Sequence, residues 1–155
     1  ADASKELAEK GKGRIVKGLE KLVEKGKITA DVKDGIAARI TPVDGIAGFA
    51  PADLVIEAAT ENVELKTKLF RQIDEVLRPG AYLATNTSSI SVTKLAAATS
   101  RPDKVIGMHW MNPPPVMKLI EIVRAVQTSD ETYALIKELS EGMGKTVTTS
   151  KDAPG

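Results

Sequence analysis

The strongest constraint on the fold is an alternation of short apolar runs with amphipathic segments in the middle of the chain. Residues 53–59, with the sequence DLVIEAA, form an apolar run typical of a parallel strand that is covered on both faces. A helix is expected over residues 63–77, and the Arg-Pro-Gly sequence at 78–80 ends it. One side of this helix carries Leu65, Leu69, Ile73 and Val76.

The same alternation continues after this helix. Residues 82–85 are expected to form a strand, 92–98 a short helix and 104–108 another strand. A β-α-β-α-β order implies right-handed crossovers and a parallel sheet, because each helix returns the chain to the start of the next strand. Further segments are a strand at 119–123, a helix at 129–142 and a short strand at 145–149. The predicted fold class is therefore α/β.

The first part of the chain is less regular. Residues 4–27 read as a charged amphipathic helix that is weakened by Gly11, Gly13 and Gly18. A second, short helix is expected to be capped by Thr29 or Asp31 and to end near residue 39. Residues 38–43 are a weak strand candidate, and their proline favours an edge position.

Length and composition narrow the class of protein. The chain has 155 residues, which suits one domain, and its net charge of +1 offers no general attraction to nucleic acid or to an anionic membrane. It has no cysteine, so a disulfide framework, a thiol nucleophile and a thiolate metal site are excluded. No apolar run approaches the roughly 20 residues that span a bilayer, and the first residues lack a signal-peptide core. A cytoplasmic protein is the simplest interpretation.

Polar residues follow the three best strand candidates. They lie at 60–62, 86–89 and 109–112. Ligands bind outside the carboxyl ends of the strands in an open α/β sheet, and parallel strands bring those ends to one rim. For any one of these residues, helix capping or a structural role is the ordinary interpretation. Their coincidence on one rim favours an active site.

His109 is the natural general base of such a site, because imidazole takes and returns a proton near neutral pH. A carboxylate on the second ring nitrogen selects the tautomer and stabilises the cation. Glu121 can supply that carboxylate if the turn at 113–115 folds the chain back. Ser88 can donate a hydrogen bond to a substrate oxygen. No G-x-S-x-G motif is present, so nothing indicates a serine hydrolase.

These residues resemble a known family. The segments NTSS at 86–89 and GMHWMNPPPVMKLIE at 107–121 are similar to the signature of L-3-hydroxyacyl-CoA dehydrogenases, most closely the bacterial 3-hydroxybutyryl-CoA type. The segment VIEAATEN at 55–62 with Lys66, and the stretch from Gly144 to Gly155, extend the similarity over most of the chain. Trp110 stands where the family often has phenylalanine, a substitution expected to be tolerated.

The resemblance implies a Rossmann-like sheet and the interconversion of 3-hydroxyacyl-CoA and 3-ketoacyl-CoA with NAD. By similarity, His109 is the base, Glu121 is its partner, and Ser88 and Asn112 contact the acyl-CoA substrate. The residues along the nicotinamide end of the cofactor would be Glu61, Lys66 and Asn86. No metal is implied, and the full-length protein would be a homodimer that binds neither nucleic acid nor membrane.

The family also has parts that this sequence lacks. No G-x-G-x-x-G turn is present: Gly11 and Gly13 read as a chance pair within a helix, and Gly142 more naturally ends one. We therefore expect residues 1–155 to be an incomplete NAD-binding domain, with the first β-α-β unit and the C-terminal helical domain absent. In a family-like arrangement, residues 38–43 and 53–59 would flank a gap of about two strands. The isolated chain should bind NAD poorly.

Several alternatives stay open. The chain could be the dehydrogenase segment of a fatty-acid-oxidation multienzyme, a related hydroxyacid dehydrogenase acting without CoA, or a non-catalytic fragment. A plain nucleotide-binding module is disfavoured by the missing glycine loop. The sequence does not determine acyl chain length, the direction of the reaction, the choice between NAD and NADP, or oligomeric state.

Overall fold

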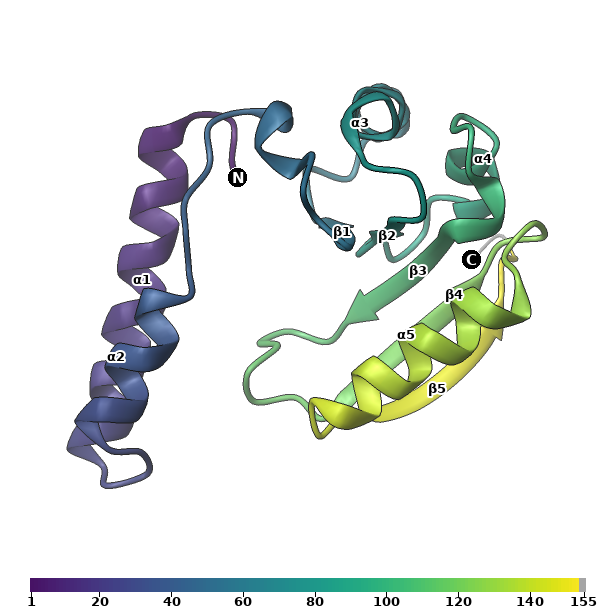
Figure 1. Cartoon of the computed structure of the whole chain (residues 1–155). Coiled ribbons are helices and arrows are strands. Elements are labelled where there is room, and N and C mark those ends of the chain that lie inside the picture. Colours follow the sequence, from purple (N-terminus) through teal and green to yellow (C-terminus); the bar gives the residue numbers. More distant parts are fainter. Residues whose placement is uncertain (154–155) are drawn as a thin grey trace. The chain divides into compact units, whose positions relative to one another are not determined.

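The structure is a computed structural model that describes residues 1–153 and divides into units 1–48 and 49–155. Figure 1 labels the elements in chain order. The length of the chain suggests one domain, whereas each of these units has its own internal contacts. Pro154 and Gly155, which end the segment that resembles the dehydrogenase family, lie outside the described residues.

The first unit is built from two helices, α1 (Lys5–Glu24) and α2 (Ala30–Ala38). Ser4 and Thr29 are the N-terminal caps of these helices, because their hydroxyl groups accept hydrogen bonds from backbone N–H groups in the first turns. Gly11 and Gly13 lie inside α1, which confirms the interpretation that they are a chance pair within a helix. Neither helix contains a buried residue.

The strand predicted at residues 38–43 is wrong. Ala38 is the last residue of α2, and residues 40–44 have no regular secondary structure. Pro42 has no N–H group to donate to a neighbouring strand, and none of the described strands pairs with this segment. The predicted gap therefore loses one of its two flanking strands. A short 3-10 helix, η1 (Ile46–Phe49), follows.

The second unit contains a five-stranded sheet in the order β1-β2-β3-β4-β5. The strands β1 (Leu54–Glu57), β2 (Tyr82–Thr85) and β3 (Val105–Trp110) are parallel, as the alternating pattern predicts. The strand β4 (Leu119–Arg124) runs antiparallel to β3, and β5 (Thr146–Lys151) is parallel to β4. The sheet is therefore mostly parallel and Rossmann-like, with one reversal of direction after β3.

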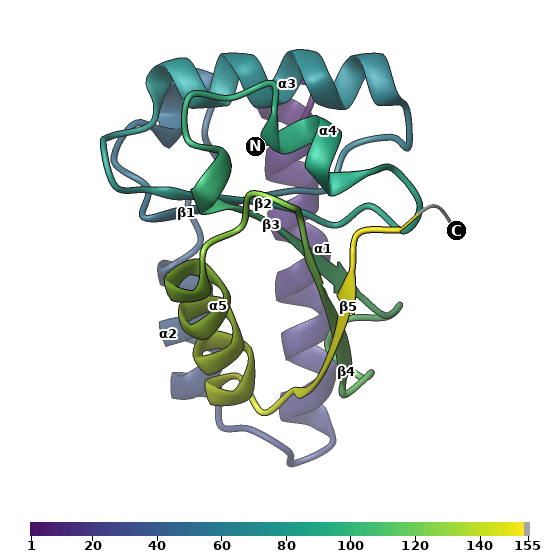
Figure 2. The same ribbon diagram turned by 90° about the vertical axis from the view of Figure 1, so that its right-hand side faces the viewer.

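Helices cover both faces of this sheet. Figures 1 and 2 show α3 (Val63–Val76) and α4 (Val92–Ala96) on one face and α5 (Asp130–Gly142) on the other. Alternate strand residues face the two layers, because successive side chains point to opposite sides of a sheet. The cluster between the sheet and α5 consists of Ala84, Ile106, Met108, Ile120 and Ile122 from the strands and Ile136 from the helix.

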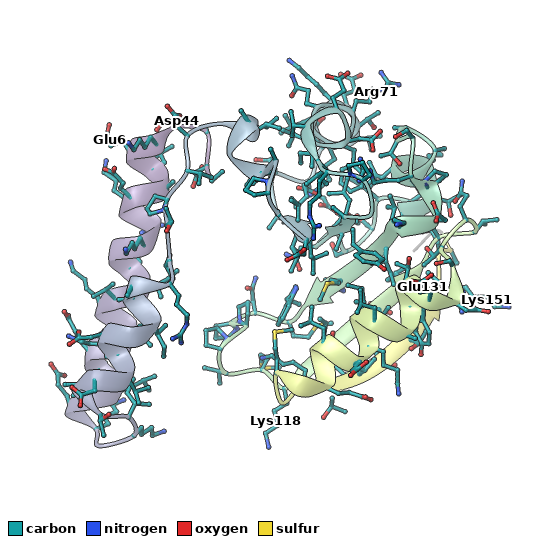
Figure 3. All side chains as sticks on the ribbon, in the orientation of Figure 1. Glu6, Asp44, Arg71, Lys118, Glu131 and Lys151 are labelled. Atoms are coloured by element: carbon teal, nitrogen blue, oxygen red, sulfur yellow. The ribbon has the colours of Figure 1, made fainter. Side chains whose placement is uncertain are left out.

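The buried face of α3 differs from the one predicted. The structure buries Lys66, Phe70 and Ile73, whereas Leu65 is exposed. One apolar stripe of this helix contains Leu65, and an overlapping stripe contains Phe70. The stripe with the larger Phe70 side chain packs on the sheet. Figure 3 shows Arg71 on the side of α3 that is turned away from the strands. A charged side chain, Lys66, therefore lies on the buried face of α3, where the sequence pattern did not place it.

None of the helices within residues 1–153 combines the length and apolar character that a membrane crossing requires.

Candidate active site

The predicted polar rim forms at the carboxyl ends of β1, β2 and β3, which are parallel and adjacent. Hydrogen bonds connect the segments that follow these strands. Glu61, after β1, accepts from the backbone of Ser88 and Ser89, after β2. Asn86 accepts a 2.8 Å hydrogen bond from the backbone N–H of Trp110, at the end of β3. The structure thus brings the three polar segments to one place.

His109 and Glu121 face each other directly across the β3–β4 pair. The imidazole Nδ1 lies 3.1 Å from Glu121 Oε2, and the two side chains are 23% and 32% exposed. The turn at 113–115 therefore folds the chain back, which is the condition on which the predicted pairing depends. His109 lies within β3, because this strand ends at Trp110, two residues later than the strand predicted at 104–108.

The surroundings of Glu121 favour its ionised form. Hydrogen bonds from His109 and from the Ser150 hydroxyl lower the pKa of this carboxyl below its usual value and outweigh the opposing effect of burial. Ser150 lies in β5, the strand on the other side of β4. An ionised carboxylate on Nδ1 selects the tautomer whose Nε2 is free to accept a proton.

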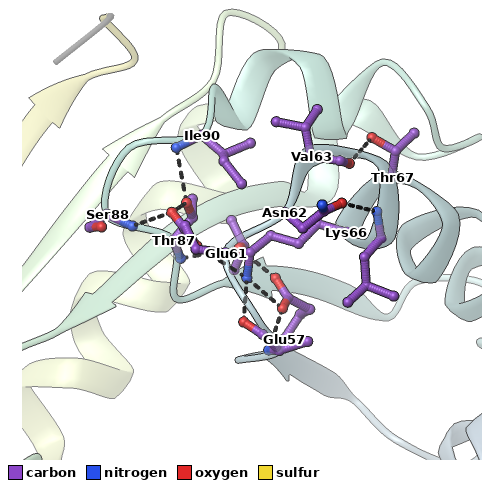
Figure 4. A network of polar contacts seen from close by, with 12 residues as sticks. Glu57, Glu61, Asn62, Val63, Lys66, Thr67, Thr87, Ser88 and Ile90 are labelled. Carbon is purple, nitrogen blue, oxygen red and sulfur yellow. Dashed lines mark hydrogen bonds and ion pairs between the residues drawn. The ribbon is translucent and has the colours of Figure 1, made fainter.

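Glu61 organises the Asn86–Ser89 turn, the segment 86–89 that follows β2. Its Oε1 accepts from the Thr87 hydroxyl, from the Ser88 N–H at 3.2 Å and from the Ser89 N–H at 3.3 Å. Burial raises the pKa of Glu61. The hydrogen bond from Thr87, the charge of Lys66 and the backbone hydrogen bonds together have a larger, opposite effect, so this pKa lies below its usual value. The predicted cofactor residue is thus a structural centre of the turn (Figure 4).

Lys66 is almost completely buried, which the sequence did not indicate. Its ammonium group donates to Glu57 Oε1 at 2.7 Å and to the Ala59 carbonyl at 3.0 Å. The Glu57 carboxylate also accepts from the Thr85 hydroxyl at 2.8 Å. The contacts of Lys66 therefore all lie within the protein at the end of β1.

The two residues predicted to contact substrate are accessible. Ser88 and Asn112 are both exposed, Ser88 in the turn after β2 and Asn112 in the loop after β3. Asn86 keeps its amide nitrogen in addition to the oxygen that binds the Trp110 N–H. A hydroxyl, two amides and an imidazole are suitable groups for holding a substrate oxygen and the carboxamide of a nicotinamide ring.

Two members of the site, Glu57 and Thr85, were not predicted from the sequence, and Thr87 was predicted only as part of the segment 86–89. Glu57 had a detectable signal, since it is an acidic residue within the apolar run 53–59. A carboxylate inside a buried strand requires a partner, and α3 is the adjacent element that can supply one. Thr85 had no comparable signal, because threonine is common in strands for steric reasons.

The polar groups fit the nicotinamide end of NAD better than its phosphates. Asn86 and the Glu61-ordered turn lie outside the carboxyl ends of adjacent parallel strands, where such folds bind nucleotides. A glycine-rich turn for the pyrophosphate does not occur in the sequence. Within residues 1–153, no group of three or more His, Asp or Glu side chains is arranged to hold a metal ion.

Comparison with known proteins gives a consistent result. Residues 1–153 match the family model described as 3-hydroxyacyl-CoA dehydrogenase, NAD binding domain. A probable 3-hydroxybutyryl-CoA dehydrogenase of Deinococcus radiodurans is 46% identical over 154 residues, which are 99% of this chain and 55% of that protein. The corresponding Bacillus subtilis protein is 44% identical over 99% of this chain and 54% of its own length.

Solved structures agree with these relatives. The crystal structure of 3-hydroxybutyryl-CoA dehydrogenase from Escherichia coli K12 has a TM-score of 0.96 and 42% identity, covering 99% of this chain and 33% of that chain. The (S)-3-hydroxybutyryl-CoA dehydrogenase from Ralstonia eutropha has a TM-score of 0.92 and 46% identity, covering 96% and 52%. The chain thus spans about half the length of the curated relatives it matches.

Proposed function

This chain belongs to the 3-hydroxyacyl-CoA dehydrogenase NAD-binding domain family, and from that membership we propose that it carries the proton-transfer site of an NAD-dependent dehydrogenase. The reaction is the interconversion of a 3-hydroxyacyl-CoA and a 3-ketoacyl-CoA. The names of the similar proteins favour 3-hydroxybutyryl-CoA as the substrate. The observation that carries the proposal is the His109–Glu121 pair, with its 3.1 Å contact between Nδ1 and Oε2.

In the oxidative direction, His109 Nε2 takes the proton of the substrate 3-hydroxyl group. Glu121 occupies Nδ1, and its negative charge stabilises the imidazolium that forms. A bound NAD would supply the acceptor for the hydride of the carbon that bears this hydroxyl. In the reverse direction His109 returns the proton to the oxygen. One imidazole therefore serves as base and acid.

The remaining residues bind and orient. Ser88 and Asn112, both exposed near the rim, contact the substrate oxygen and favour the charge that develops there. Asn86 and the turn that Glu61 orders lie along the nicotinamide end of the cofactor. The pyrophosphate of NAD requires a glycine-rich segment in addition to residues 1–155, and we propose that these residues are the incomplete NAD-binding domain expected from the sequence.

A multienzyme context is the second candidate. The α subunit of the fatty acid oxidation complex of Psychrobacter arcticus is 36% identical over 154 residues, which are only 21% of its length. The same site would then act on 3-hydroxyacyl-CoA derived from fatty acids within a larger protein. For the enzyme of ordinary size we propose a cytoplasmic homodimer that binds neither membrane nor nucleic acid, in keeping with the balanced charge of +1.

The test is NADH consumption with acetoacetyl-CoA by the intact protein that contains this chain. His109→Gln removes the proton-transfer group at similar size and should lower kcat by about 100- to 10,000-fold. Tyr133→Phe is the matched control, because its hydroxyl contacts Thr149 on the sheet face that packs against α5. Turnover by His109→Gln at the rate of the control would contradict the proposal.

A further inference from the structure

Two opposite charges are buried at the end of β1. The side chain of Lys66 is 1% exposed and that of Glu57 is 3% exposed. Lys66 lies on the buried face of α3, one turn before Phe70. Figure 4 shows this pair at the base of a network that extends to the turn after β2. Neither residue contacts His109 or Glu121 through a hydrogen bond in the described part of the chain.

The pair uses nearly all of its hydrogen-bonding capacity on neighbouring backbone and side chains. Beyond Glu57 and the Ala59 carbonyl, the Lys66 ammonium lies 3.5 Å from Glu61 Oε2. Glu57 Oε1 also accepts from the Ala59 N–H at 2.5 Å. The chain between the end of β1 and Glu61 is thus tied to Lys66 at three points, and its conformation depends on this ammonium group.

Two connections lead from the pair to the Asn86–Ser89 turn. The first is Glu61, which accepts from both hydroxyl and backbone groups of this turn. The second is Thr85, whose hydroxyl donates to Glu57 and accepts from the Thr87 N–H at 3.2 Å. Displacement of either charge would therefore release the turn at both of its supports.

A stabilising role does not by itself account for a buried ion pair. The cost of removing two charges from water is about as large as their attraction, and apolar pairs of similar volume are often as stable. What an ion pair adds is defined geometry, since its hydrogen bonds have fixed partners and directions. The network places that geometry beneath Ser88 and Asn86, the two residues of the turn to which the proposed function gives roles.

We propose that Glu57 and Lys66 are positioning residues, a buried ion pair that holds the Asn86–Ser89 turn in the conformation needed for binding substrate and cofactor. The pair acts on the turn through Glu61 and Thr85. The catalytic consequence rests on the proposed function. The coupling between the pair and the turn does not, because it is a property of the fold.

The decisive variant replaces both charges, Glu57→Met together with Lys66→Met. An apolar pair of similar length removes the ion pair without leaving one charge buried alone, so the fold should be retained. Glu57→Gln is the second variant, which keeps shape and removes one charge. Ile73→Val, on the same face of α3, is the control for a simple loss of packing.

The first measurement is hydrogen exchange of individual amides by NMR. We expect exchange at Ser88 and Ser89 to become at least about tenfold faster in both test variants, while Leu83 and Ala84 in β2 keep their protection. The Ile73→Val control should show no selective change at the turn. Unchanged exchange at Ser88 and Ser89 in both test variants would overturn the proposal.

The second measurement separates positioning from overall stability. In the intact enzyme we expect kcat to fall by about tenfold or more in both test variants, with His109→Gln still lowering it further. If exchange changes but kcat equals that of Ile73→Val, the turn is coupled to the pair without catalytic effect, and the proposed role is refuted. An unmodified enzyme with no turnover would refute the proposed function, whereas the exchange result would still decide the coupling.

Discussion

Gly107→Ala is the substitution for which the structure makes the sharpest prediction. Gly107 lies in β3 opposite Val123 of β4, and one pair of facing residues, Met108 and Ile122, separates this pair from His109 and Glu121. A Cβ atom at this position would be 2.7 Å from Val123 Cβ and 3.2 Å from a methyl group of Val92 in α4. The absence of a side chain allows α4 and β4 to approach β3 closely at this point.

The magnitude follows from these distances. Facing Cβ atoms in an antiparallel pair are ordinarily about 4.5–5.5 Å apart, so the new methyl group is short of space by about 2 Å. Neither Cβ can move by rotating a side chain, because each is fixed to its backbone. The strands must therefore separate locally. We expect destabilisation at the upper end of the overpacking range, about 3 kcal/mol, and a longer His109–Glu121 contact.

Urea unfolding followed by tryptophan fluorescence is the appropriate assay, because Trp110 is the only tryptophan and lies at the end of β3. With a slope of about 2 kcal/mol per molar, the midpoint should fall by about 1.5 M. Gly142→Ala is the control. A Cβ there meets nothing within 4 Å, so this substitution should leave stability unchanged or raise it.

A double-mutant cycle identifies the cause. Val123→Gly removes the atom with which the new methyl group collides, so it should recover part of the loss in the Gly107→Ala background. The coupling should be at least about 1 kcal/mol. If Gly107→Ala unfolds within about 0.5 kcal/mol of the parent, or if the two substitutions are additive, the close approach of the strands has no energetic importance.

Two further predictions concern contacts away from the His109–Glu121 pair. Asp152 accepts hydrogen bonds from Ser91, Val92 and Thr93 at the start of α4. Burial raises the pKa of Asp152, but the hydrogen bonds from these three residues hold it below its usual value of 3.8. Asp152→Ala should therefore cost about 2 kcal/mol at pH 7, a loss that disappears as the pH falls through the folded-state pKa, in urea titrations at each pH. A constant difference between parent and variant down to pH 2 would contradict this. Arg101 donates to the Asp74 carboxylate and to four carbonyls at and after the end of α3. Arg101→Lys should therefore lower the free energy of unfolding by about 2–3 kcal/mol. Parental stability of this variant would show that a point charge is sufficient at this position.

Some elements of the fold were predictable because their signals are local. The strand at 82–85 was predicted with its observed bounds, and Thr29, one of the two candidate caps, caps α2. Both depend on residues within a few positions of each other. The strand at 38–43 was wrong for a related reason. Local composition permits an extended segment there, but a strand also needs a neighbour, and none of the described strands provides one.

The candidate site shows the same division. The gathering of 60–62, 86–89 and 109–112 on one rim follows from the β-α-β order, which is a rule about connections and could be applied without coordinates. The buried face of α3 could not be predicted in the same way. Two apolar stripes compete on that helix, and only its packing on the sheet places Lys66 inside and Leu65 outside.

The sequence by itself determined the alternating α/β order, the two candidate caps of α2 and the choice of His109 as the proposed proton-transfer group. Those properties depend on residue type and on neighbours within a few positions. Only the tertiary structure decided that β4 runs antiparallel to β3, which places Glu121 beside His109, and that Lys66 meets Glu57 in the interior. Register and burial are set by packing between segments that are distant in the chain, as in the Thr85–Glu57 contact across 28 positions. No local pattern carries that information, because the energy of a buried charge depends on what surrounds it after folding.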